Sequence, residues 1–192
     1  MTQRPITIRQ KPLRAILQAP DGLIRLRRPQ DGLYKNVTEG DLLWLREQFY
    51  LPERVDHLSP TGAEAADISA VFAVDLFGQD HAVMGLGISR AAHTLPRFWS
   101  RFHFTVRSVT RQNLLEITLA EAQAEGFSSR EAWIRDWDNM VSSVSGRMRT
   151  RMSEYDPEVL VFDLQLHRSP VDRTQKAGPE NTSATIRETG NV

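Results

Sequence analysis

The sequence predicts an α+β fold: a small, partly open β-barrel of mixed, mostly antiparallel strands, with helices flanking it. Three observations carry this prediction. The strand-like stretches are unevenly spaced, unlike the regular strand–helix alternation of a doubly wound sheet. Two helix-start patterns lie between residues 118 and 131 and separate the later strands. The last apolar alternation, at 158–167, is typical of one long final strand.

The domain organisation follows from length and composition. The chain has 192 residues, of which 40% are hydrophobic, so it can bury one core, and we expect one domain at 1–167. From Arg168 the chain is rich in polar residues and poor in apolar ones. This composition is typical of disorder, so we expect a disordered tail at 168–192.

Four elements are expected in the first fifty residues. Residues 6–8 alternate as in a short strand, and 12–20 begin with a proline suited to the first turn of a short helix. Residues 23–29 alternate apolar and basic side chains, as in a half-buried strand with cations on one face. A Gly-Asp turn pair precedes the apolar run 42–45, which we interpret as a buried strand.

The middle of the chain is expected to contain a loop, a hairpin and a long strand. Residues 51–67 are rich in Pro, Gly and Ala without periodicity, which indicates a loop. Residues 69–76 and 81–88 are interpreted as the two strands of a hairpin. Residues 102–115 alternate as a further strand, on which His103 is expected to face outward.

Two helices are expected before the final strand. Thr118 with Glu121, and Ser128 with Glu131, match the capping box, and Gly126 suits the residue that follows a helix end. The second helix carries an apolar stripe at helical spacing. Its members are Trp133, Trp137, Met140, Val141, Val144 and Met148. We interpret this stripe as a core contact.

Charge is balanced overall but unevenly distributed. The net charge is zero, yet bases outnumber acids in the first 111 residues and acids outnumber bases afterwards. Nearly all the bases are arginine, whose planar guanidinium binds phosphate or carboxylate with two parallel hydrogen bonds and stacks on rings. Any polyanionic partner is therefore expected on the first part of the chain.

Composition and motifs exclude several classes of function. Without cysteine there is no disulfide, thiolate metal site or cysteine nucleophile. No apolar run approaches the roughly 20 residues that span a bilayer, and the N-terminus lacks the apolar block of a signal peptide, so we expect a cytoplasmic protein without membrane contact. Walker, GxGxxG, HExxH and GxSxG motifs are missing, and the histidines lack ligand spacing, so no metal and no cofactor are expected.

Arginines on one expected strand form the first candidate site. Arg25, Arg27 and Arg28 lie within residues 23–29. They either guard an exposed sheet edge with charge or form an anion-binding face, and the sequence leaves both interpretations open.

The remaining candidates lie at the ends of expected elements. Arg46 and Glu47 follow a buried strand, where they are either a solvated pair or the rim of a cleft. Arg97 and Arg101 flank Trp99, which either stacks on a nucleobase or belongs to the core. Glu125 ends its helix, either in solvent or directed into a cleft.

Four blocks, in this order, resemble the ASCH domain family, in particular its phage and bacterial members. They are Leu13–Leu17 leading to Arg27-Arg28-Pro29, then Glu39–Glu47, then Leu95–Arg101, then Ile117–Gly126. The second and third are similar to the GDxLWVRE and MPRWASR blocks of these proteins. The resemblance covers about residues 6–167.

The resemblance implies a PUA-like barrel with a central cleft that accepts a nucleotide or an RNA segment. Some small members hydrolyse the acetyl amide of N4-acetylcytidine with a Lys and a Thr from a GRKT-like motif and a Glu from a later helix. Glu125 matches that Glu. The Lys and Thr are not matched, because this chain has Gly22-Leu23-Ile24-Arg25 there, and an arginine does not readily lose its proton.

These observations lead to three functional expectations. The first is a binding module for single-stranded RNA or a nucleotide-like ligand, with the arginines and Glu47 bordering the cleft and Trp99 under a base. The alternative is an amidohydrolase on an acylated nucleoside, with Glu125 as general acid or base. The third is an accessory protein whose barrel serves protein contacts.

Overall fold

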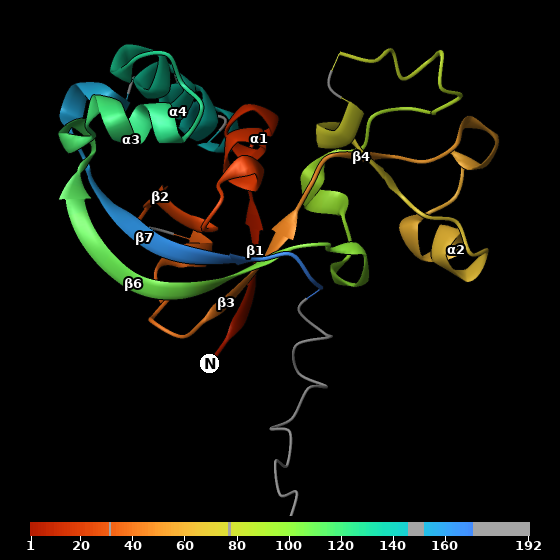
Figure 1. The fold of residues 1–192 in the computed structure, drawn as a ribbon, viewed down its shortest axis with the longest axis horizontal. Coiled ribbons are helices and arrows are strands. Elements are labelled where there is room, and N and C mark those ends of the chain that lie inside the picture. Colours follow the sequence, from red (N-terminus) through yellow and green to blue (C-terminus); the bar gives the residue numbers. More distant parts are fainter. Residues whose placement is uncertain (31, 77, 146–151, 171–192) are drawn as a thin grey trace, which may run out of the picture.

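The structure, a computed structural model, describes residues 1–30, 32–76, 78–145 and 152–170. The described part is α+β, with a mixed five-stranded sheet, a two-stranded sheet and four α-helices (Figure 1). Short 3-10 turns connect many of these elements.

The main sheet places strands in an order different from that of the sequence. Across the sheet the order is β1 (Gln3–Thr7), β3 (Leu42–Arg46), β6 (His103–Asn113), β7 (Glu158–His167) and β2 (Leu23–Pro29). The first pair is parallel and the other three pairs are antiparallel. β6 and β7 are the longest strands, and both curve strongly (Figure 1).

The sheet curls until its two edge strands, β1 and β2, come close together. The Arg28 guanidinium on β2 donates from Nη2 to the carbonyl oxygen of Thr7 on β1 at 3.1 Å. Arg4 on β1 donates from Nη1 to the carbonyl oxygen of Leu33, just beyond β2, at 3.0 Å. In the described residues the backbones of β1 and β2 do not pair, so barrel closure stays a prediction.

The two faces of β7 pack into two different hydrophobic cores. Its even-numbered apolar residues pack into the main core with β1, β3, β6 and α1 (Gln10–Gln18). Its odd-numbered Val159 and Val161 pack into a second core beside Trp133 and Trp137 of α4 (Arg130–Ser145). Because both faces are covered in its first half, β7 carries a continuous apolar run there, from Val159 to Phe162. The predicted final strand at 158–167 is confirmed.

Three helices lie on the concave side of the curved sheet, namely α1, α3 (Leu119–Ala124) and α4 (Figure 1). The predicted capping box of α3 is confirmed: Thr118 Oγ1 accepts from Glu121 N at 3.2 Å, and Glu121 Oε2 accepts from Thr118 N at 2.8 Å. Gly126 follows the helix with φ of +81°. A Cβ at this glycine would lie 3.2 Å from the Cβ of Ala15 on α1, so the glycine also permits close packing of the two helices.

The second predicted capping box, Ser128 with Glu131, is wrong: the helix cap lies one residue later and pairs with Ala132, which has no polar side chain to return a hydrogen bond. Ser129, and not Ser128, accepts a hydrogen bond from the N–H of Ala132, at 3.1 Å, and α4 begins at Arg130. At the end of α3, Gly126 N bonds Gln123 O at 2.9 Å and Phe127 N bonds Ala122 O at 3.0 Å. Ser128 is therefore the one residue between this C-terminal motif and the Ser129 cap. The side chains of Val141 and Val144 and all of Met148 lie outside the described residues.

The predicted hairpin at 69–76 and 81–88 is wrong. Only Val71–Phe72 is a strand (β5), and it pairs with β4 (Phe49–Tyr50), which lies far from it in sequence. Residues 81–88 form turns with one isolated bridge, because this segment folds against the loop after β4. A Cβ at Gly87 would lie 2.3 Å from the Cγ of Asp56, so this approach depends on glycine.

The predicted loop at 51–67 contains a helix, α2 (Pro60–Ala65). Ser59 caps it by accepting from Gly62 N at 3.1 Å, and Pro60 occupies its first position. With β4 and β5, this helix forms a second lobe beside the main sheet (Figure 1). None of the helices in the described residues combines the length and apolar character needed to cross a bilayer.

His103 does not face outward as predicted, since its exposed fraction is 1%. It lies opposite His167 in the register of β6 and β7, and the two rings stack with centroids 4.6 Å apart. His103 Nδ1 lies 2.8 Å from the carbonyl oxygen of Ser169, so the chain after β7 covers this end of the sheet.

Candidate functional site

A cavity of about 570 Å³ lies between β2, β6, β7, α1 and α3. Its apolar lining consists of Ile16, Ala19, Leu23, Ile24, Ala124 and Leu164. Its polar lining consists of Arg25, Arg107, Ser108, Glu121, Glu125 and Asp163. Apolar walls with a few polar groups, at this size, are typical of small-molecule sites, which span about 300–1,000 Å³.

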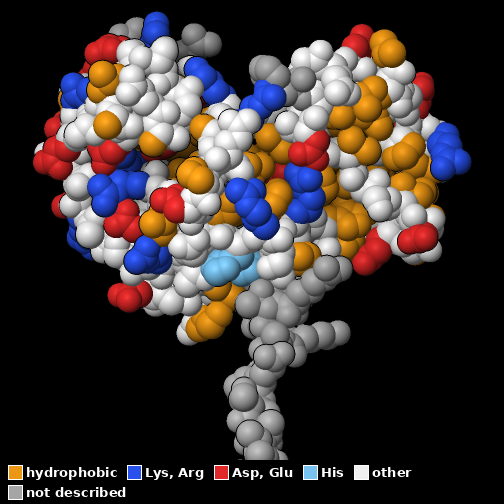
Figure 2. Space-filling view, in the orientation of Figure 1, with side chains coloured by type: hydrophobic (Ala, Val, Ile, Leu, Met, Phe, Trp, Pro, Cys, Tyr) orange, Lys and Arg blue, Asp and Glu red, His pale blue; other side chains and the backbone are white. Residues whose placement is uncertain are grey.

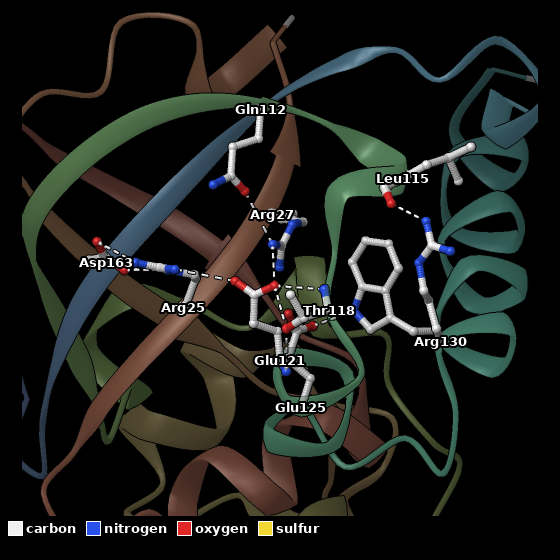
Figure 3. Close-up of polar contacts among 10 residues, drawn as sticks. Arg25, Arg27, Gln112, Leu115, Thr118, Glu121, Glu125, Arg130 and Asp163 are labelled. Carbon is white, nitrogen blue, oxygen red and sulfur yellow. Dashed lines mark hydrogen bonds and ion pairs between the residues drawn. The ribbon is translucent and has the colours of Figure 1, made fainter.

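Arg25 connects two carboxylates in the wall of this cavity. It lies opposite Asp163 in the register of β2 and β7, and the two form a bidentate pair, Nε–Oδ1 at 2.7 Å and Nη2–Oδ2 at 3.2 Å (Figure 3). Arg25 Nη1 also lies 3.2 Å from Glu121 Oε1. The hydrogen bonds that Arg25 donates to Asp163 and Glu121 raise the pKa of Arg25, so this side chain stays charged.

Asp163 is satisfied by its neighbours. Besides Arg25, the hydroxyl of Ser108 donates to Asp163 Oδ2 at 2.8 Å. The hydrogen bond from Arg25 is the largest contribution that lowers the pKa of Asp163, and burial opposes it. Asp163 is therefore an ionised carboxylate whose charge is matched at contact distance.

Arg27 is buried behind the cavity wall. Its exposed fraction is 1%, its Nη2 lies 3.0 Å from Glu121 Oε2, and Nη2 also donates to Gln112 Oε1 at 3.2 Å (Figure 3). Burial alone raises the pKa of Glu121, but hydrogen bonds from the Thr118 N–H and from Arg27 lower it to about 2. Glu121 is thus ionised near neutral pH.

Glu125 differs from the other two carboxylates. It follows the last residue of α3 and is 8% exposed. Trp133 Nε1 donates to its Oε2 at 2.8 Å, whereas Oε1 has no hydrogen-bond partner within the described residues. Burial raises the pKa of Glu125 to about 7, against the hydrogen bond from Trp133 and the charges of Arg28 and Arg27. This group therefore exchanges a proton near neutral pH.

Glu47 and Arg101 form a second cluster, at the base of the lobe that carries β4 and β5. Glu47 is 1% exposed, and Arg101 contacts it twice, Nη2–Oε1 at 2.6 Å and Nε–Oε2 at 3.1 Å. Arg101 Nη1 lies 2.7 Å from Asp75 Oδ2, and its guanidinium carbon lies 3.9 Å from the ring centroid of Phe72. Burial raises the pKa of Glu47, and Arg101 opposes this effect. The cluster ties the two parts of the fold together.

The other predicted residues also lie away from the cavity lining. The Arg46 guanidinium carbon lies 4.7 Å from the ring centroid of Trp44. Trp99 is half-buried in a small core, with its ring at 5.7 Å from that of Phe49 in an edge-on arrangement. Arg97 lies in the same 3-10 turn as Trp99 and is half-buried.

The predicted site residues therefore divide into two sets. Arg25 and Glu125 line the cavity, Arg27 contacts the lining residue Glu121, and Arg28 acts on Glu125 through its charge. Arg46, Glu47, Arg97, Trp99 and Arg101 are not among its lining residues. On the face seen in Figure 2, basic and acidic side chains alternate over the half that carries α3 and α4, without one continuous basic surface.

Sequence reasoning missed four residues of the site. Glu121 was assigned to helix capping alone, and Trp133 to core packing alone, although an indole N–H needs a partner when buried. Asp163 interrupts the apolar pattern of β7, and this interruption could have identified Asp163 as a candidate site residue. No sequence pattern identifies Arg107 as a site residue, because its position depends on the register of β6 and β7.

Fold and site together define an α+β domain with a cavity built around one buried carboxyl group and an arginine–carboxylate network. Comparisons with protein-family models, with curated proteins and with solved structures found no match for this chain. Within the described residues, no group of three or more histidine, aspartate or glutamate side chains is arranged to hold a metal ion.

Proposed function

We propose that this protein binds a nucleotide or a nucleotide-like unit of single-stranded RNA in the cavity beneath α3. The observation that carries the proposal is the cavity itself: about 570 Å³, apolar on several sides, with Arg25, Glu121, Glu125 and Asp163 among its polar lining residues. The resemblance to ASCH domains supports it, as does a PUA-like, partly open barrel, inferred from the approach of β1 and β2 through Arg28.

The apolar lining suits the faces of a base. Leu23 and Ile24 on β2 and Ala124 on α3 present accessible aliphatic carbon to the space, while Leu164 and Ile16 lie beneath this surface in the core. Burying a base between such surfaces removes apolar area from water, worth about 25 cal/mol for each Å². The polar edge of the base then needs hydrogen-bond partners, since an unpaired buried polar group costs about 1–3 kcal/mol.

Glu125 is suited to that polar edge. A protonated carboxyl donates one hydrogen bond and accepts others, whereas the ionised form only accepts. Because the pKa of Glu125 is about 7, both forms are present near neutral pH. A base that presents a donor and an acceptor side by side matches this group.

The test is a titration of the protein with cytidine, cytidine 5′-monophosphate (CMP) and a short oligocytidylate at low salt, by calorimetry. We expect saturable binding to the wild type. Ala124→Phe fills the cavity from α3 and should abolish binding, because Ala124 is a lining residue with an exposed side chain. Ala120→Phe is the matched control, since Ala120 is exposed on the same helix and does not line the cavity. Absence of binding to every probe, or equal loss in both variants, would refute the proposal.

A second candidate function is hydrolysis of an acylated nucleoside such as N4-acetylcytidine. The raised pKa of Glu125, about 7, favours it, since a general acid–base group works best when its pKa is near the working pH. In this scheme the Glu125 carboxylate takes a proton from water as the water oxygen attacks the acetyl carbonyl carbon. The same carboxyl then gives that proton to the leaving amine, and acetate and the free nucleoside are released.

Arg25 would have a supporting part in that reaction. Its charge is permanent, so it stabilises a developing oxyanion and does not act as a base. The test is release of acetate from N4-acetylcytidine by the wild type, by Glu125→Gln and by Glu64→Gln, where Glu64 is exposed on α2. Turnover by the wild type and by Glu64→Gln, but not by Glu125→Gln, is expected. Equal turnover by Glu125→Gln would remove this role from Glu125.

A further inference from the structure

A bulge in β6 places an additional arginine at the cavity. In the pairing of β6 with β7, Val106 lies opposite Leu164 and Ser108 lies opposite Asp163, so Arg107 has no opposite residue. Such a bulge bends its strand and redirects a side chain, and bulges are frequent beside binding sites. Here Arg107 is exposed, and it lines the cavity together with Arg25 and Asp163.

The charges around Arg107 are already matched without it. Arg25 and Ser108 satisfy Asp163, while Arg25, Arg27 and Thr118 satisfy Glu121. Within the described part of the chain, no hydrogen bond or ion pair joins the guanidinium of Arg107 to another group. Its effect on Asp163 is exerted through space only, lowering the pKa of that carboxyl. Arg107 is therefore a cation of the cavity that no carboxylate neutralises at contact distance.

The cavity consequently offers different chemistry on its solvent side and in its interior. Arg107 is exposed, whereas Glu125 is 8% exposed. An anionic group keeps part of its hydration at an exposed arginine and still gains charge-assisted hydrogen bonds. An uncharged base, in contrast, has a small desolvation cost. It can enter the buried end of the cavity and form hydrogen bonds there with the partly protonated carboxyl of Glu125.

We propose that Arg107 binds the phosphate of the ligand, and that the site therefore takes phosphorylated nucleotides, as monoesters or as phosphodiester units, in preference to free nucleosides. This inference rests on the proposed function, and it adds the residue that sets the preference. The planar guanidinium donates two parallel hydrogen bonds to phosphate oxygens. The base and sugar then occupy the apolar interior towards Glu125.

The experiment compares dissociation constants of cytidine, CMP and the dinucleotide CpC for the wild type, Arg107→Gln and Arg111→Gln. Arg111 is the matched control, because it is exposed on the same strand and does not line the cavity. We expect the wild type to bind CMP or CpC about tenfold more tightly than cytidine, as one charge-assisted contact provides. Arg107→Gln should lose this difference and keep the affinity for cytidine, and Arg111→Gln should keep the difference.

The outcomes separate this inference from the proposed function. If cytidine binds and neither phosphorylated ligand binds more tightly, Arg107 has no such role, although the cavity is still a nucleoside site. A preference that persists in Arg107→Gln also overturns the inference. If none of the three ligands binds, both proposals fail. If the inference holds, the tighter binder of CMP and CpC shows whether the site prefers a phosphate monoester or a phosphodiester.

Discussion

Replacing Glu125 by Gln should change the pH dependence of stability, and the direction follows from its burial. The pKa of Glu125 is raised from 4.5 to about 7 in the folded protein, chiefly by burial. The folded state therefore binds the proton more tightly than the unfolded state. Stability contributed by this group is fully present below about pH 4.5 and is lost as pH rises through about 7.

The size of the effect follows from the same shift. A displacement of the pKa from 4.5 to about 7 corresponds to about 3 kcal/mol of unfolding free energy, at 1.36 kcal/mol for each pH unit. Glutamine does not titrate and still offers an oxygen to Trp133 Nε1. Relative to the wild type, Glu125→Gln should therefore become more stable by up to about 3 kcal/mol between pH 5 and pH 8.

The assay is urea unfolding, followed by tryptophan fluorescence, of the wild type, Glu125→Gln and Glu64→Gln at intervals from pH 5 to pH 8.5. Titration of all other groups cancels in the difference between wild type and variant. The exposed Glu64 should give a flat difference. A difference for Glu125→Gln that does not change with pH would show that this carboxyl is not held protonated by burial.

Two further predictions concern stability. Arg101→Met leaves the carboxylate of Glu47, which is 1% exposed, without its partner and should cost about 3–5 kcal/mol in urea unfolding; replacing both by apolar residues should recover much of this loss, and no recovery would contradict the reasoning. Gly126→Ala forces a side chain into a residue with φ of +81° and into contact with Ala15, so it should lower the unfolding free energy by about 1–2 kcal/mol. An unchanged denaturation midpoint would mean that α3 can end in another way.

Elements determined by local pattern were predictable from the sequence. The final strand alternates over ten residues, and β7 occupies the predicted 158–167. The capping box of Thr118 depends on residues three apart, and it forms as predicted. The hairpin at 69–76 and 81–88 failed because β5 pairs with β4, a contact between distant segments that no local pattern specifies.

In the candidate site, too, contacts between segments distant in sequence could not be predicted. Glu125 was predicted from its place at a helix end and from the ASCH resemblance, and the cavity does include it. The pair of Arg25 with Asp163 joins residues 138 apart in sequence, so it depends on the register of β2 and β7. Arg107 depends on a bulge in β6, which a regular alternation of side chains does not reveal.

Glu121 connects the cavity wall to the start of a helix. One carboxylate closes the first turn of α3 through Thr118 and also holds Arg25 and Arg27. Under the proposed function, a ligand that attracts Arg25 would compete with Glu121 and Asp163 for the same guanidinium. Any change in that pairing would act on the first turn of α3 through the shared carboxylate, so we expect the stability of this helix end to depend on whether the cavity is filled.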